Sequence, residues 1–181
     1  MAKTIGLATL LSGQGKNMVY EFWNVFEKEY NSVGVQSFDY PNLGYQGGSC
    51  EDINLLKIDV EKVSENIHSF EVNIEGFGYF EEPSDVVYLK VKKNNKLTKL
   101  HSTLNNLLTR HCDTVFDLYK PNNWVPHITL AMGDISPDNL TLFRNRYQYM
   151  TPEFTQLITN ISLVEFQDDG DVELIKKYEI N

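Results

Sequence analysis

The stretch Trp124-Val125-Pro126-His127-Ile128-Thr129-Leu130 has the alternating pattern of a strand that is buried on one face. Successive strand side chains point to opposite faces, so His127 and Thr129 share one face while Ile128 and Leu130 share the other. An imidazole exchanges protons near neutral pH, and a threonine hydroxyl can hydrogen-bond a phosphate oxygen. The stretch therefore predicts half of an acid/base site for phosphodiesters.

A second His-x-Thr-Leu pattern, at residues 101–104, has a different interpretation. It lies in a segment whose leucines recur at helical spacing, namely Leu97, Leu100, Leu104, Leu107 and Leu108. Residues two positions apart on a helix do not share a face. We therefore assign His101 to a helix and not to the site.

The charge of the chain limits its ligands. The 181 residues carry a formal net charge of −9 at pH 7. An extended nucleic-acid surface needs a face rich in lysine and arginine, which this charge disfavours. We expect the partner to be a small phosphate ester, a nucleotide or the end of an RNA. We expect the protein to bind neither a metal nor another cofactor and to be a monomer.

Cys50 and Cys112 match no metal-ligand spacing and are too few for a disulfide framework, which favours two free thiols in a reducing compartment. The N-terminal apolar run is short, is interrupted by Thr9 and lacks a cleavage pattern, so it is interpreted as a strand and not as a signal peptide. No segment has the length needed to span a bilayer. These features predict a cytoplasmic protein with no membrane contact.

The predicted elements follow an irregular order. Strands are expected at residues 3–11, 36–40, 69–74, 86–91, 115–118, around 127, and at 154–166 and 172–180, with Gly47 and Gly48 breaking the chain after 45. Helices are expected at residues 17–30, 53–67 and 96–110 and after an N-cap at Ser136. This order predicts an α+β fold with antiparallel sheets. We expect residues 1–181 to form a single domain.

Two segments of the chain repeat one pattern. Tyr40-Pro41-Asn42-Leu43-Gly44-Tyr45 aligns with residues 125–130, with a proline before the key position and apolar residues at the inward positions of both. Asn42 and His127 are 85 residues apart, about half of the chain. The repeat therefore pairs Asn42 with His127 and Gly44 with Thr129.

With these motifs, the sequence resembles the two-histidine (2H) phosphoesterase superfamily, in its 2'-5' RNA ligase-like and cyclic phosphodiesterase branch. The most specific element is Pro126-His127-Ile128-Thr129-Leu130, which is similar to the second motif of that family. The resemblance implies two lobes related by a pseudo-two-fold axis, with antiparallel sheets, helices on the outer faces and a central cleft. It also implies metal-free acid/base catalysis on 2',3'-cyclic or 2'-5'-linked RNA ends or nucleotides.

At the first motif, Asn42 and Gly44 stand where the family has histidine and threonine or serine. An amide can hydrogen-bond a phosphate oxygen but cannot exchange a proton near neutral pH. We assign His127 as the acid/base group and Thr129 as the phosphate ligand. The expected substrate-binding residues are Asn42, Gly44, Tyr45 and Trp124, the two aromatic rings stacking a base or lining the cleft.

Three interpretations of the site remain open. The first is an enzyme that acts on small phosphodiesters, and the second is a nucleotide- or phosphate-binding module on the same fold that has lost efficient turnover. The third is that His127 is a buried structural histidine without a ligand. His68 and His111 are expected at helix ends, outside the site.

Overall fold

The computed structural model describes residues 1–181 and contains two antiparallel sheets, which confirms the predicted α+β fold. The first sheet has the strand order β5 (Thr114–Val115), β2 (Asn42–Cys50), β1 (Lys3–Leu10), β8 (Asn160–Phe166) and β9 (Val172–Glu179). The second has the order β6 (His127–Met132), β4 (Val86–Val91), β3 (Phe70–Phe80) and β7 (Glu153–Ile158). Each sheet therefore contains one of the two motif strands, β2 or β6.

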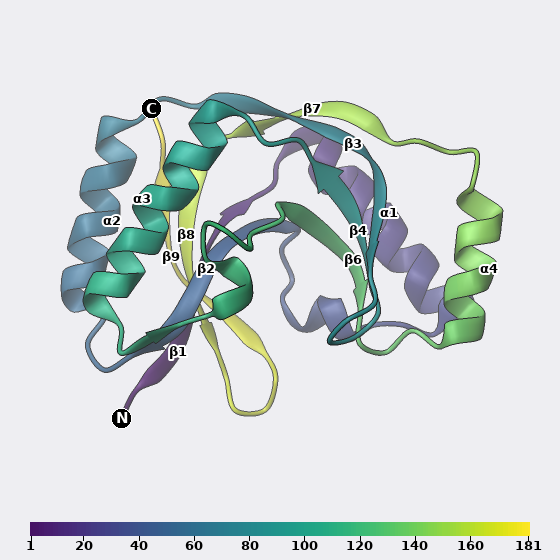
Figure 1. Ribbon diagram of the computed structural model, residues 1–181, viewed down its shortest axis with the longest axis horizontal. Coiled ribbons are helices and arrows are strands. Elements are labelled where there is room, and N and C mark those ends of the chain that lie inside the picture. Colours follow the sequence, from purple (N-terminus) through teal and green to yellow (C-terminus); the bar gives the residue numbers. More distant parts are fainter.

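Helices cover the two sheets from opposite sides of the molecule (Figure 1). Helices α2 (Asn54–Asn66) and α3 (Asn95–His111) pack on the first sheet. Helix α1 (Gly13–Tyr30) packs on the second, and α4 (Pro137–Tyr147) packs beside α1 with Phe143 against Phe77 of β3. All five leucines of the predicted stripe on α3 are buried, and Ser136 caps α4 as predicted. Helix α1 follows β1 of the first sheet but packs on the second, and α3 follows β4 of the second sheet but packs on the first. None of the helices combines the length and apolarity needed to cross a membrane.

The segment around the first motif differs from the predicted one in two ways. Residues 36–40 do not form a strand, because a short 3-10 helix, η1 (Gly34–Ser37), occupies their start. Strand β2 does not end at Gly47 and Gly48 but runs through them to Cys50. A Cβ atom on Gly48 would overlap the carbonyl of Thr114, so the glycine allows β5 to pair closely with β2.

Two further strands were predicted too long. The segment 154–166 forms two strands in different sheets, β7 and β8, separated at Thr159. Asn160 fixes the start of β8, because its Oδ1 accepts a hydrogen bond from the N–H of Leu10 and its Nδ2 donates one to the carbonyl of Leu10. The predicted strand at 115–118 is only the short β5, followed by a second 3-10 helix, η2 (Asp117–Tyr119). The chain leaves the first sheet after β5 and returns to it after β7. Local sequence patterns do not reveal such changes of sheet.

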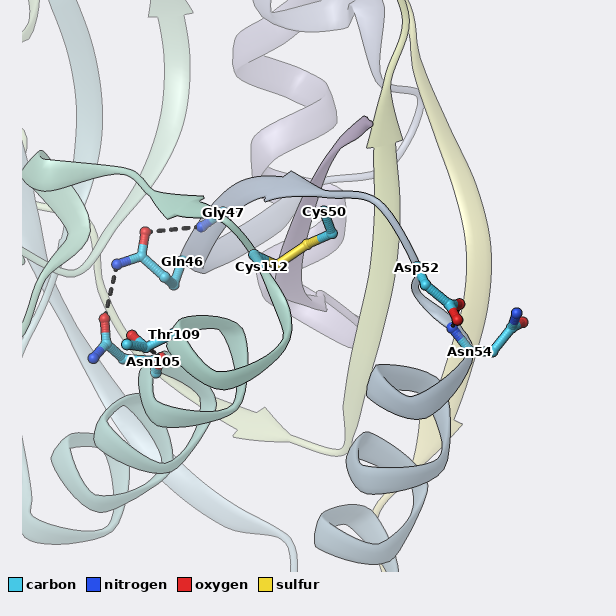
Figure 2. The surroundings of a disulfide bond; sticks show 8 residues. All are labelled: Gln46, Gly47, Cys50, Asp52, Asn54, Asn105, Thr109 and Cys112. Carbon is cyan, nitrogen blue, oxygen red and sulfur yellow. Dashed lines mark hydrogen bonds between the residues drawn. A yellow bond between two sulfur atoms is a disulfide. The ribbon is translucent and has the colours of Figure 1, made fainter. Parts of the chain in front are cut away.

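The prediction of two free thiols is wrong, because Cys50 and Cys112 form a disulfide. The bond joins the end of β2 to the residue that follows α3 (Figure 2). Nearby, Gln46 donates a hydrogen bond to Asn105 at 2.9 Å, so strand and helix are connected twice. A pair of cysteines 62 residues apart gives no sequence signal of this proximity. The two cysteines therefore no longer indicate a reducing compartment.

Removing the disulfide should destabilise the protein. A cross-link that closes a loop of this length lowers the conformational entropy of the unfolded chain. The corresponding increase in the unfolding free energy is about 4 kcal/mol at 25 °C. We expect the Cys50→Ser, Cys112→Ser double variant to lose about 3–4 kcal/mol of unfolding free energy in urea denaturation. The control is reductant: it should lower wild-type stability to that of the variant and leave the variant unchanged. Equal stability of oxidised and reduced wild type would contradict the prediction.

Candidate functional site

Strands β2 and β6 contact each other where the two sheets meet. In both strands, the side chains alternate as the sequence predicts. Asn42 and Gly44 are partly exposed while the residues after each of them are buried, and the same holds for His127 and Thr129. The polar pairs of the two motifs therefore lie on the open faces of their strands.

The backbone of the two strands is irregular at equivalent positions. Strand β2 has a bulge at Tyr45, which is skipped in the pairing with β1, and β6 has a bulge at Leu130, which is skipped in the pairing with β4. These two residues are 85 positions apart, the same offset as Asn42 and His127. A bulge bends its strand and redirects neighbouring side chains. The repeat seen in the sequence is thus also a repeat in backbone geometry.

In each motif strand, one carbonyl group accepts a hydrogen bond from a tryptophan side chain. The indole N–H of Trp124 donates to the carbonyl of Gly44 at 3.1 Å, and the indole N–H of Trp23 donates to the carbonyl of Thr129 at 3.2 Å. Gly44 and Thr129 also differ by 85 positions. Three independent features, the prolines, the bulges and the bound carbonyls, therefore pair Asn42 with His127 and Gly44 with Thr129.

Two adjoining hollows lie between the motif strands. The first has a volume of about 300 Å³, and Asn42, Gly44 and Thr129 line it. The second has a volume of about 240 Å³, and His127 and Thr129 line it. Thr129 lies on the border of the two, together with Tyr119 and Met132. The two motifs thus open into one continuous cleft, with Asn42 and His127 on its two sides.

The surroundings of His127 favour a neutral imidazole with one free nitrogen. Its Nδ1 donates to the carbonyl of Val125 at 2.7 Å, which leaves Nε2 as an acceptor. Three aromatic rings surround it, with ring centroids at 5.1 Å for Phe80, 5.4 Å for Tyr88 and 6.1 Å for Tyr119. Burial lowers the pKa of His127 below its ordinary value, against the opposing effect of the hydrogen bond to Val125. A side chain in this state can accept a proton at neutral pH.

On the other side of the cleft, Asn42 offers hydrogen bonds only. Its Nδ2 donates to the carbonyl of Tyr40 at 3.0 Å, which holds the amide against its own strand. No lysine or arginine lines either hollow, and the second contains one carboxylate, that of Glu82. No group of three or more His, Cys, Asp or Glu side chains is placed to hold a metal ion. The polar groups of the cleft are therefore mostly neutral.

Tyr45 lines the first hollow and Trp124 the second, which is one of the two roles expected for them, while their burial leaves no face on which a base could stack. Tyr45 is 0% exposed and its hydroxyl is hydrogen-bonded to Thr9, while Trp124 is 2% exposed. The indole of Trp124 stacks on His101, with ring centroids 3.9 Å apart and planes 6° from parallel. The buried rings of Tyr45 and Trp124 therefore shape the wall of the cleft.

His101 lies on α3, as predicted, and outside both hollows. Its Nε2 is hydrogen-bonded to the carbonyl of Tyr119 at 2.9 Å, and burial lowers its pKa. His68 is exposed after α2, and His111 ends α3 with its Nε2 2.9 Å from an Asp59 oxygen. Neither lines the two hollows.

Two residues near the cleft were not found from the sequence. Asp134, after β6, accepts hydrogen bonds from the backbone N–H groups of Val33 and Gly34, both at 2.7 Å, and from the hydroxyl of Ser32. Burial alone would raise the pKa of Asp134, but these bonds outweigh it and lower the pKa. The contacts fix η1, which lines the first hollow through Val35. The second residue is Tyr119 on η2, for which the sequence offered no signal.

Comparisons with known proteins agree with this geometry. A family model described as the 2'-5' RNA ligase superfamily matches residues 42–170. Two proteins of Staphylococcus epidermidis strains, named "Putative phosphoesterase" and "Putative phosphoesterase SERP0604", are each 24% identical over 170 residues, covering 92% of this chain and 92% of theirs.

Solved structures share the fold at low identity. The Thermus thermophilus protein TT0787 has a TM-score of 0.67 and 15% identity, over 99% of this chain and 98% of its own. Escherichia coli LigT, crystallised with 3'-AMP, has a TM-score of 0.62 and 14% identity, also over 99% and 98%. The family match spans both motif strands and the cleft between them. The chain therefore belongs to the 2'-5' RNA ligase superfamily, the 2H phosphoesterases.

Proposed function

We propose that this protein hydrolyses small phosphodiesters, namely 2',3'-cyclic or 2'-5'-linked nucleotides or RNA ends, by acid/base chemistry that is centred on His127. The observation that carries the proposal is the shared cleft. A histidine with a free Nε2 and a threonine lie across it from the equivalent positions of the other motif strand. LigT, which shares the fold, has been crystallised with 3'-AMP and with phosphate, which carry the phosphate group that the proposed substrates share.

In this mechanism His127 acts as the general base. Its Nε2 takes a proton from the attacking water while the Thr129 hydroxyl and the Asn42 amide hold phosphate oxygens. The hydrogen bond from Nδ1 to Val125 fixes the tautomer that this role requires. The leaving oxygen receives its proton from water, since Asn42 cannot supply one.

The charge of the cleft favours a phosphodiester over a phosphomonoester. A diester carries one negative charge, whereas a monoester carries between one and two at neutral pH. With no lysine or arginine lining the hollows, a second charge would be desolvated without a compensating cation. Product release is favoured for the same reason.

The direct test is hydrolysis of 2',3'-cyclic AMP and of an oligonucleotide with a 2',3'-cyclic end, followed by separation of the products between pH 5 and 8. We expect slow conversion to a monoester. Absence of any conversion over this range by the wild type would exclude the enzymatic function.

The pH dependence of turnover should have an acid limb only. Protonated His127 cannot accept a proton, so kcat/KM should fall as the pH drops through the lowered pKa of His127, below 6.5. Toward alkaline pH the profile should stay flat, because Asn42 does not titrate. Initial rates measured from pH 4.5 to 9 test this expectation. A bell-shaped profile in the wild type would require a second titrating group that the assignment lacks.

A second candidate function is binding without turnover. It is favoured by Asn42, whose amide can hold a phosphate oxygen but cannot transfer a proton. In that case calorimetry would detect uptake of 2',3'-cyclic AMP with no product formed, and His127→Ala would weaken the binding. Undiminished binding by that variant would exclude a role for His127 in the ligand site.

A further inference from the structure

Tyr119 occupies the border between the two halves of the cleft. It is the last residue of η2, and the segment is held from below by the hydrogen bond between its carbonyl and His101 Nε2 at 2.9 Å. Three residues line both hollows, namely Thr129, Tyr119 and Met132. Of these, only Thr129 and Tyr119 carry a hydroxyl group.

The ring of Tyr119 lies beside Gly44, the position equivalent to Thr129. A Cβ atom on Gly44 would lie 3.7 Å from Cε1 of Tyr119, which is an ordinary van der Waals contact. The centroid of the same ring is 6.1 Å from that of His127. The phenol therefore stands between the first motif, which lacks a hydroxyl, and the acid/base group of the second.

The hydroxyl of Tyr119 is available for a ligand. It makes no hydrogen bond within the protein. Among the side-chain polar atoms without a partner, only the hydroxyl of Tyr178 is fully buried. The hydroxyl of Tyr119 must therefore reach solvent, although the residue as a whole is half-buried. Burial raises the pKa of Tyr119, so the hydroxyl keeps its proton and acts as a hydrogen-bond donor.

We propose that Tyr119 is a phosphate-binding residue that supplies the hydroxyl that Gly44 lacks. The site then has two hydroxyl donors, Thr129 from β6 and Tyr119 from η2, on either side of the bound anion. This inference rests on the proposed phosphodiester function. It adds to it a residue that comes from neither motif.

The test compares Tyr119→Phe with the wild type on 2',3'-cyclic AMP and on inorganic phosphate. Because Tyr119→Phe loses a hydrogen bond to a charged group, we expect its kcat/KM for the diester to fall about 10- to 100-fold and its Kd for phosphate to rise by a similar factor. The matched control is Tyr79→Phe, because Tyr79 on β3 is also partly buried but lines neither hollow. Its kinetic constants and Kd should remain within about twofold of the wild type, in line with the small effects of changes away from such contacts.

A rescue experiment separates binding from packing. Gly44 has no left-handed backbone conformation and has room for a Cβ atom, so the backbone and the first side-chain atom of Gly44→Thr fit this position. Gly44→Thr in the Tyr119→Phe background should recover most of the lost affinity and rate, because it returns a hydroxyl to the same side of the anion. Unfolding midpoints of all variants should agree within a few degrees.

The outcomes are distinct. If the wild type binds and turns over the diester while Tyr119→Phe is unchanged, the role of Tyr119 is excluded and the proposed function stands. Loss in Tyr119→Phe without rescue by Gly44→Thr overturns the replacement of one hydroxyl by the other. If the wild type neither binds phosphate nor converts the diester, the proposed function fails, and the assignment of Tyr119 fails with it.

Discussion

The Asn42→His variant is expected to hydrolyse 2',3'-cyclic AMP about 10²- to 10⁴-fold faster than the wild type, the usual contribution of a positioned proton-transfer group. The reason is the pairing of Asn42 with His127 across the cleft, supported by the bulges at Tyr45 and Leu130. A histidine at position 42 can protonate the leaving oxygen, which Asn42 cannot. The measurement is kcat/KM with its pH profile, which should gain an alkaline limb as the new imidazolium deprotonates.

The matched control is Asn42→Gln, which keeps an amide and should show no gain and no alkaline limb. Adding Gly44→Thr to Asn42→His should raise the rate little further if Tyr119 already supplies a hydroxyl on that side. An Asn42→His protein that folds normally but remains as slow as the wild type would show that position 42 does not face the leaving group.

The His127→Gln variant should lose about 10²- to 10⁴-fold in kcat/KM on the same substrate. Glutamine retains the ability to hydrogen-bond an oxygen but cannot accept a proton near neutral pH. Binding of the diester should therefore change much less than turnover, and the acid limb of the pH profile should disappear. Rates from pH 4.5 to 9 and calorimetric Kd values separate the two effects.

His111→Gln provides the control for this variant. His111 contacts Asp59 at the end of α3 and lines neither hollow, so its replacement should leave kcat/KM unaffected. A His127→Gln protein that retains wild-type turnover would remove His127 from the chemistry. Glu82, the one carboxylate that lines the cleft, would then be the remaining group able to take the proton from the attacking water.

Local pattern was most informative where one short segment fixes its own geometry. The leucines of α3 predict a helix, and that assignment correctly excluded His101 from the cleft. The alternation in residues 127–130 predicts which side chains are open. Pattern was least informative where the chain changes sheets. The division between β7 and β8 depends on Asn160 binding to Leu10, a contact between residues 150 positions apart.

The site shows the same division. Thr129 and Gly44 were placed in the cleft from their motifs, whereas Tyr119 entered through a 3-10 helix that no pattern announced. Trp124 and Tyr45 lie beside or within the motifs in the sequence. Trp124 stacks on His101 and Tyr45 is hydrogen-bonded to Thr9, so both rings are buried in the wall of the cleft. Adjacency along the chain does not say which face of a bent strand a neighbour covers.

By itself, the sequence determined the motif strand of His127, its partner segment 85 residues earlier, the α+β fold and the family. The strand, its partner segment and the fold class follow from periodicity and spacing. The family follows from the resemblance of residues 126–130 to its second motif and from the match of residues 42–170 to its model. Only the tertiary structure decided that Cys50 and Cys112 are joined, that Asn42 and His127 lie on two sides of one cleft, and that Tyr119 stands between them. Such contacts depend on how the two sheets and the helices pack. Packing brings together residues that are far apart in the sequence, and their separation along the chain does not predict their distance in space.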